Sequence, residues 1–173
     1  MLRCKVGNKI LHSYDYEPEQ FIKWADSSKL KCPDCDEQLL FKNGVFMVRH
    51  FSHKVGLSCK RKEEFYERET SEHETGKLNL FNWIKNQIGV KNAEMERYIQ
   101  ETRQRPDIYF EQDGHKYAIE YQCSPLGIYE YEDRHRLYEC AGIKDIWIFG
   151  TEKYSEKKLI EIYGTKKYKK IVL

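Results

Sequence analysis

The stretch RPDIYFEQDGHKYAIEYQCS, residues 105–124, contains two β-rich runs on either side of the pair Asp113-Gly114. An Asp-Gly pair between two such runs is a strong signal for a two-residue turn. The stretch therefore predicts an antiparallel hairpin in which Gln112 lies opposite His115. The candidate acidic site follows from this register.

The register brings two carboxylates together. Counting outward from the turn, Asp107 lies opposite Glu120, and opposed side chains have Cβ atoms about 4.5–5.5 Å apart. Tyr109 and Ala118 share their face, and the other face is also apolar. Strands that are apolar on both faces are usually buried, so the two carboxylates need a cation or a shared proton. The alternative is a solvent-exposed hairpin face on which the charges need no partner.

A buried carboxylate pair suits Mg²⁺ or Mn²⁺, which prefer oxygen ligands. Such a cation can activate water and stabilise the charge that develops when a phosphodiester is hydrolysed. Gln122 lies two residues after Glu120 and therefore on the same face of its strand. Its amide could position the water or bind the metal through its oxygen. The pattern predicts a hydrolytic metal site at Asp107, Glu120 and Gln122.

A second set of metal ligands lies near the N-terminus. Cys32 and Cys35 form a Cys-Pro-Asp-Cys knuckle, and Zn²⁺ prefers four thiolate or imidazole ligands in a closed tetrahedral site. We expect His53 and Cys59 to complete it, with His50 and His53 as the alternative pair. A redox role for the two cysteines is less favoured, because the motif precedes a predicted hairpin and not a helix that would lower a thiol pKa.

The composition of the chain changes near residue 63. Residues 1–62 hold turn signals, the cysteine knuckle and short extended pieces, with a two-residue turn expected at Asn43-Gly44. The later part predicts helix, strand, hairpin, helix, strand and helix, at 71–88, 93–101, 105–124, 131–142, 144–150 and 155–164. We therefore expect an α/β fold with a small N-terminal zinc-binding module (1–62) and a mixed sheet flanked by helices (63–173).

Composition excludes some classes of protein. The chain of 173 residues is 40% hydrophobic and 34% charged, and no apolar run approaches the roughly 20 residues of a membrane span. Without a signal peptide, a cytoplasmic protein with no membrane partner is expected. The net charge of +2 is too small to predict nucleic-acid binding by itself. Positive charge does gather at 53–62, where it could meet a DNA backbone, and at 165–173.

Seven short motifs occur in a fixed order: CPDC (32–35), HFSH (50–53), SEHETGK (71–77), RPDIYF (105–110), IEYQCSPL (119–126), RHRLYECAG (134–142) and DIWIFG (145–150). Together they resemble the competence protein CoiA-like family of the PD-(D/E)XK nuclease superfamily, in the variant where Glu-x-Gln replaces Glu-x-Lys. The resemblance runs from about residue 32 to residue 150. It implies a restriction-endonuclease-like core and a Mg²⁺-dependent nuclease that cuts phosphodiester bonds, with DNA as the expected partner.

The resemblance also assigns roles to single residues. It implies a catalytic set of Glu72, Asp107, Glu120 and Gln122. It makes His73, Lys77 and Arg134 candidates for contact with nucleic acid, and Arg134 shares a helix face with Tyr138. Without the resemblance, His73 and Lys77 could equally form an exposed pair one helical turn apart. Arg134 and Tyr138 could equally serve core packing and salt bridges.

One departure from the usual signature opens a second hypothesis. Gln122 is neutral where a lysine usually orients the nucleophile and stabilises charge. The alternative function is a catalytically weak or inactive nuclease-fold module that binds nucleic acid or a protein partner, including another copy of itself. Competence, repair and defence against foreign DNA remain open as pathways.

Overall fold

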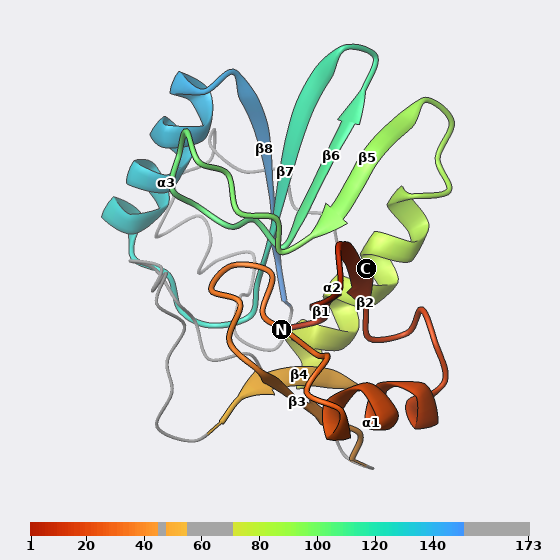
Figure 1. Cartoon of the computed structure of the whole chain (residues 1–173). Coiled ribbons are helices and arrows are strands. Elements are labelled where there is room, and N and C mark those ends of the chain that lie inside the picture. The colour runs from red at the N-terminus through yellow and green to blue at the C-terminus, as the bar shows by residue number, and fades with distance from the viewer. Residues whose placement is uncertain (45–47, 55–70, 151–173) are drawn as a thin grey trace. The chain divides into compact units, whose positions relative to one another are not determined.

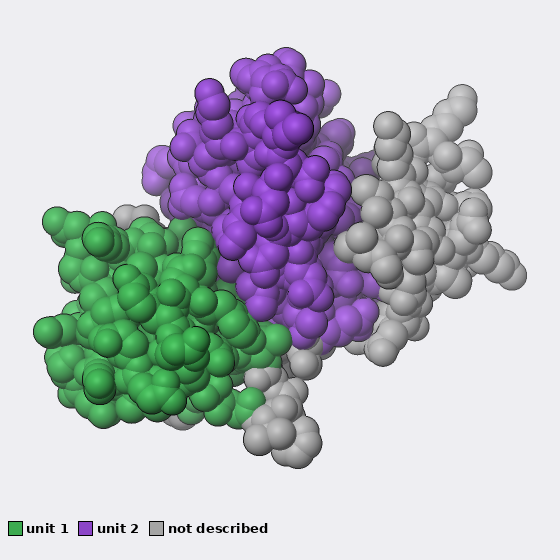
Figure 2. All heavy atoms as spheres, turned by 90° about the vertical axis from the view of Figure 1, so that its right-hand side faces the viewer, with its two compact units in different colours: residues 1–66 green, residues 67–173 purple. Residues whose placement is uncertain are grey.

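The computed structural model describes residues 1–44, 48–54 and 71–150 (Figure 1). The chain divides into two compact units, Met1–Tyr66 and Glu67–Leu173 (Figure 2). Each unit has buried hydrophobic clusters of its own. The described elements make an α/β protein with a mixed sheet and three helices, which confirms the class predicted from the sequence.

In its described residues, 1–44 and 48–54, the first unit has two small antiparallel sheets and one helix. Its elements are β1 (Arg3–Val6), β2 (Lys9–His12), α1 (Pro18–Asp26), β3 (Leu39–Lys42) and β4 (His50–His53). Phe21 lies at the centre of the core, with ring centroids 5.1 Å from Phe41 and 5.2 Å from Phe51. Cys32 is buried in the same cluster, so the knuckle is part of this core.

The sequence analysis missed helix α1. Pro18 stands at the start of this helix, where its missing N–H is not needed and its fixed φ favours helix. Phe21, Trp24 and Ala25 follow at spacings of three and four residues and pack in the core cluster. These two signals together would have identified the helix.

The hairpin of β3 and β4 is present, but its predicted turn is wrong. Lys42 pairs with His50, so the connection is much longer than the two-residue turn expected at Asn43-Gly44. The observed register places Phe41 opposite Phe51, and both rings pack in the core of the unit. Packing of these aromatic side chains therefore outweighs the local turn preference.

The second unit is built on a four-stranded sheet in the order β5-β6-β7-β8. The strands are β5 (Val90–Met95), β6 (Ile108–Gln112), β7 (His115–Gln122) and β8 (Ile143–Phe149). The first three are antiparallel, and β7 and β8 are parallel. The hairpin of β6 and β7 has the predicted register, with Gln112 opposite His115. Asp113 and Gly114 both have positive φ, of 51° and 77°, as a type I′ turn requires.

Two helices complete the described part of the second unit, α2 (Ser71–Ile84) and α3 (Ile128–Cys140). Helix α2 ends earlier than predicted. Ile88, expected on its apolar face, is 95% exposed, because the chain turns after Ile84 to enter β5. The predicted last helix, at 155–164, lies outside the described residues. No helix in the described part of the chain has the length and apolar character needed to cross a membrane.

Helices α2 and α3 cover opposite faces of the sheet (Figure 1). Gly76 of α2 lies so close to β7 that a Cβ there would come within 2.5 Å of the Tyr121 ring. Arg134 and Tyr138 of α3 bond to Glu120. Since adjacent residues of a strand point to opposite faces, the two helices enclose β7 from both sides.

Candidate active site and metal centre

Asp107 comes directly before β6, where its carboxylate replaces a backbone partner in the sheet. Its Oδ2 accepts a hydrogen bond of 2.7 Å from the backbone N–H of Tyr121 in β7. Two side chains of α2 also reach it: His73 Nε2 lies 3.1 Å from Oδ2, and Lys77 Nζ lies 3.6 Å from Oδ1. One N–H and two basic groups therefore fix this carboxylate at the start of the strand.

These neighbours decide the charge of Asp107. Burial alone would raise the pKa of Asp107, but His73, Lys77 and the Tyr121 N–H together lower it below the ordinary 3.8. The carboxylate is ionised at neutral pH and carries a charge that a cation can use.

The first turns of α2 present a polar side to the interior. His73 and Lys77 are 7% and 0% exposed, so the alternative of an exposed surface pair is wrong. Lys77 Nζ donates a hydrogen bond of 2.7 Å to Glu96 Oε1. Glu96 follows β5, is 4% exposed, and has a positive φ of 54°. Its backbone N–H donates to the carbonyl oxygen of Asp107 at 3.0 Å.

The sequence analysis did not identify Glu96. Nothing in the sequence marks it, because its importance comes from a backbone conformation and a partner on another element. The one available signal is weak: Lys77, on a helix with an apolar side, needs a carboxylate if it is buried.

Glu120 lies in the middle of the sheet, with its carboxylate on the α3 side. Its Oε1 accepts a hydrogen bond of 2.6 Å from the Tyr138 hydroxyl and a salt bridge from Arg134. Its Oε2 accepts no hydrogen bond from the residues that the structure describes. Arg134 is itself held by the Gln104 side chain at 3.3 Å and by the face of the Trp147 ring, 5.1 Å away.

The pKa of Glu120 is raised in spite of its ion pair with Arg134. Burial raises the pKa of Glu120 to about 7, and the charge of Asp107 adds to this, while Arg134 and the Tyr138 hydroxyl oppose it. A carboxylate that ionises only near neutral pH, with one oxygen open, suits a bound cation.

The structure differs from the prediction in how the two carboxylates meet. They were expected side by side on one face, but Asp107 contacts α2 and Glu120 contacts α3. The reason is that Asp107 precedes the ladder, which begins with Ile108 opposite Ile119, and bonds along the plane of the sheet. Their charges still interact, because Asp107 raises the pKa of Glu120.

Two further residues of the predicted set lie near the end of β7. Gln122 is 3% exposed, and its Nε2 donates to the Ser124 carbonyl at 2.8 Å. Glu72 approaches Gly150, whose N–H donates to the Gln122 carbonyl: a Cβ on this glycine would come within 2.9 Å of Glu72 Oε1. Glu72 therefore lies near Gly150, whose backbone is bonded to that of Gln122, at one end of the parallel strand pair.

The cysteine knuckle gathers three of the four predicted zinc ligands. One ligand atom from each of Cys32, Cys35 and His53 lies within 4.8 Å of the other two, and Cys35 Sγ is 3.3 Å from His53 Nε2. Burial lowers the pKa of His53, which favours the neutral imidazole that binds metals. His50 does not join this group, and its Nδ1 lies 3.0 Å from a backbone carbonyl. Cys59 lies outside the described residues.

Two ion pairs tie the knuckle to β1. Arg3 Nη2 lies 3.2 Å from Oδ1 of Asp34, the residue between the two cysteines, and both side chains are 5% exposed. Lys5 Nζ lies 2.6 Å from Asp36 Oδ1, in a more exposed position. The loop that carries the ligands is thus held in place by groups that do not themselves bind metal.

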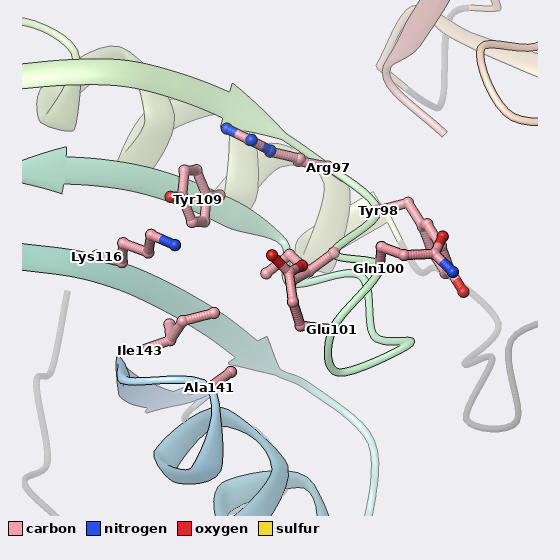
Figure 3. Close-up of a pocket in the computed structure, with 9 residues that line it drawn as sticks. Arg97, Tyr98, Gln100, Glu101, Tyr109, Lys116, Ala141 and Ile143 are labelled. Atoms are coloured by element: carbon pink, nitrogen blue, oxygen red, sulfur yellow. The ribbon is translucent and has the colours of Figure 1, made fainter.

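A pocket of about 180 Å³ shares no residue with the predicted sites (Figure 3). It is lined by Arg97, Tyr98, Ile99, Gln100, Glu101, Tyr109, Lys116, Ala141 and Ile143. The Arg97 guanidinium lies over the Tyr109 ring, 4.3 Å from its centroid. Since no carboxylate of the predicted set lines it, this pocket is separate from the candidate metal site at Asp107 and Glu120.

Comparison with known proteins identifies the family. The model of the nuclease-like domain of competence protein CoiA matches residues 69–170, and that of the CoiA N-terminal domain matches residues 13–62. Competence protein CoiA of Bacillus subtilis (strain 168) is 34% identical over 119 residues, which cover 69% of this chain and 31% of that protein. The chain thus aligns with about a third of the length of this relative, and no solved structure matches. The chain belongs to the competence protein CoiA family.

Proposed function

We propose that this chain is a nuclease that hydrolyses phosphodiester bonds in DNA, with Mg²⁺ or Mn²⁺ held by Asp107 and Glu120. The observation that carries the proposal is the pair of interacting carboxylates, Asp107 partly buried and Glu120 buried. Glu120 has an oxygen that accepts no hydrogen bond from the described residues and a pKa raised to about 7. The match of a nuclease-like domain over the same residues supports it.

The side chains around Asp107 and Glu120 have different proposed roles. When bound, a divalent cation lowers the pKa of water and neutralises charge on the phosphate. His73 and Lys77 keep Asp107 ionised and fixed, and Arg134 holds one oxygen of Glu120 so that the other is left for the ion. These three basic residues are buried, which favours support of the carboxylates over direct contact with DNA.

Glu72 and Gln122 complete the proposed catalytic set. Gln122 ends β7, two residues after Glu120, and Glu72 reaches Gly150 from α2, where the Gly150 N–H bonds to the Gln122 carbonyl. Glu72 would assist as a further carboxylate of the set. Gln122 would contribute through its side-chain oxygen, because its Nε2 is already bonded to the Ser124 carbonyl.

For the first unit we propose a structural Zn²⁺ held by Cys32, Cys35, His53 and Cys59. The closeness of the first three and the neutral form of His53 support this choice. A closed site of two or more thiolates with imidazole is typical of structural zinc, which cross-links segments that have too small a core of their own.

The test is DNA degradation by the purified chain on linear, circular and single-stranded DNA with Mg²⁺ or Mn²⁺. Asp107→Asn and Glu120→Gln should abolish cleavage, because each replaces a negatively charged ligand of the proposed ion by a neutral amide. Asp133→Asn is the matched control, since this carboxylate is exposed on α3 and forms a surface pair with Arg136. Full activity in either of the first two variants, or without divalent cation, would contradict the proposal.

The second candidate is a nuclease-fold module that binds nucleic acid or a protein without cleaving. Two observations favour it: Gln122 stands where lysine is usual, and Arg134 already offsets part of the charge of Glu120. Gel-shift binding with no cleavage under any of the conditions above would support this reading. In either case the family relation suggests a role in handling DNA during competence, with repair and defence as alternatives.

A further inference from the structure

We propose that Glu96 sets the affinity of the acidic site for its divalent cation by neutralising Lys77, as a positioning residue outside the predicted catalytic set. This inference rests on the proposed function, because it concerns the cation at Asp107 and Glu120. It assigns a task to a buried carboxylate that neither binds the ion nor touches Glu120.

Glu96 is connected to Asp107 through two sets of contacts. Its backbone N–H donates to the Asp107 carbonyl at 3.0 Å. Its side chain acts through Lys77, whose Nζ lies 2.7 Å from Glu96 Oε1 and 3.6 Å from Asp107 Oδ1. The side chains of Lys77 and Glu96 are only 0% and 6% exposed, so water screens these charges little.

The backbone of Glu96 supports a role at the site. Its φ of 54° lies in the left-handed region, which costs free energy for residues other than glycine. The conformation is held by bonds to both of its backbone groups: the N–H to Asp107, and the carbonyl, which accepts a hydrogen bond of 3.2 Å from Arg105. Strain that is retained beside a buried charge cluster is typical of functional sites.

The negative charge of Glu96 offsets the positive charge of Lys77 beside Asp107. Two carboxylates share one ammonium, and the ammonium lies closer to Glu96 than to Asp107. If Glu96 were neutral, the Lys77 ammonium would be drawn more strongly to Asp107, and a divalent cation would have to compete with it for that carboxylate. With Glu96 charged, Lys77 orients Asp107 while most of the charge of Asp107 stays available to the ion.

The test measures cation binding, not cleavage, on the whole chain. Mn²⁺ binding is followed by electron paramagnetic resonance, and Mg²⁺ binding by calorimetry. Glu96→Gln should weaken binding about tenfold or more, because a charge is lost within a poorly screened cluster. The double variant Lys77→Met/Glu96→Gln should return to within about threefold of wild type, because the competing ammonium is gone as well.

Three controls separate charge from folding. Glu94→Gln, two residues earlier on β5 in a more exposed pair with Arg97, should bind the cation as wild type does. Glu96→Asp keeps the charge and should bind within about threefold of wild type. Circular dichroism and thermal unfolding show which variants are folded, and the double variant and Glu96→Asp test the proposal even if Glu96→Gln does not fold.

The outcomes distinguish this inference from the proposed function. If Glu96→Gln binds as wild type does, or the folded double variant stays as weak as Glu96→Gln, the role of Glu96 is wrong while the metal site stands. If wild type and Asp107→Asn bind Mn²⁺ equally, Asp107 holds no cation. The proposed metal site and the role of Glu96 are then both wrong.

Discussion

The buried carboxylate of Glu120 forms an ion pair with the Arg134 guanidinium. Arg134 bonds its Oε1, and both side chains are at most 9% exposed. Removal of one partner from a buried ion pair leaves the other without compensation, which costs about 3 kcal/mol or more. Arg134→Met should therefore lower the free energy of unfolding by that amount in urea titrations.

The matched control for this prediction is Arg136→Met, two residues later on α3. Its side chain is 67% exposed and pairs with Asp133 at the surface. Such substitutions change stability by about 0.5 kcal/mol or less. Equal stability of the two variants would show that the Arg134 pair contributes little.

The raised pKa of Glu120 gives stability an unusual pH dependence in protein without added divalent cation. The folded-state pKa of about 7 exceeds the ordinary 4.5, so the folded chain binds this proton more tightly than the unfolded chain. The contribution is complete below 4.5 and is lost as the pH rises through 7. The lowered pKa of Asp107 acts only below 3.8, outside this window.

Added Mg²⁺ should reverse that trend, because the ion binds the ionised carboxylate. The increase in Tm on adding Mg²⁺ should be larger near about pH 8 than near about pH 5. Thermal unfolding at both pH values, with and without the ion, measures it. If Glu120→Gln shows the same pH dependence as wild type, another group is responsible.

At the scale of elements, the contact of α2 with β7 depends on Gly76. A Cβ at this position would come within 2.5 Å of the Tyr121 ring, on which His73 also stacks. Gly→Ala in a helix usually stabilises, but here the overlap should cost about 1–3 kcal/mol. We expect Gly76→Ala to unfold more easily and to lose DNA cleavage, because α2 carries His73 away from Asp107.

Gly127→Ala serves as the control, because a Cβ at that position meets nothing within 4 Å and its φ is −72°. This variant should keep cleavage and lose about 1 kcal/mol of stability or less, because Gly127 is the N-cap of α3 and alanine caps less well than glycine. Urea unfolding and the DNA assay give the two readouts. A Gly76→Ala protein that is more stable than wild type would mean that α2 does not pack as closely as described.

Elements governed by local signals could be predicted, and those governed by distant packing could not. Asp113-Gly114 set the central hairpin and its register, because an Asp-Gly turn permits few alternatives. The same reasoning gave the wrong turn at Asn43-Gly44, where the pairing of Phe41 with Phe51 decides. The end of α2 was also missed, since Ile88 fits the helical spacing but points to solvent.

The candidate site was predictable to a similar extent. Asp107 and Glu120 stand out because carboxylates in apolar strands need partners. The register did not bring the two carboxylates side by side. Asp107 lies one residue before the paired part of β6, and its carboxylate bonds to the Tyr121 N–H in the plane of the sheet. The partners of the pair, Lys77 with Glu96 and Arg134 with Tyr138, are set by helix packing that no spacing in the sequence reveals.

At the scale of the whole molecule, the first unit should depend on the proposed zinc ion. Its core is small and includes Cys32, so loss of the ion would leave the knuckle without its cross-link. Cys35→Ser, or removal of zinc by a strong chelator, should unfold this unit in a separate transition at lower temperature. Metal analysis of the purified chain and calorimetric unfolding measure the two effects.

His50→Ala is the control, because His50 lies outside the ligand group. This variant should retain about one zinc per chain and the wild-type transition. Loss of zinc from it, or full zinc content in Cys35→Ser, would overturn the proposed ligand set. Unfolding of the second unit should change little in either variant, since it has its own buried clusters.

The bond between Asp107 and the Tyr121 backbone gives the site a spectroscopic reporter. The Tyr121 amide should exchange slowly with deuterium, although its acceptor is the side chain of the residue just before β6. Asp107→Asn keeps an acceptor oxygen, so slow exchange should persist, whereas Asp107→Ala should expose the amide. An inactive Asn variant with a protected amide would therefore separate loss of charge from local opening of the sheet.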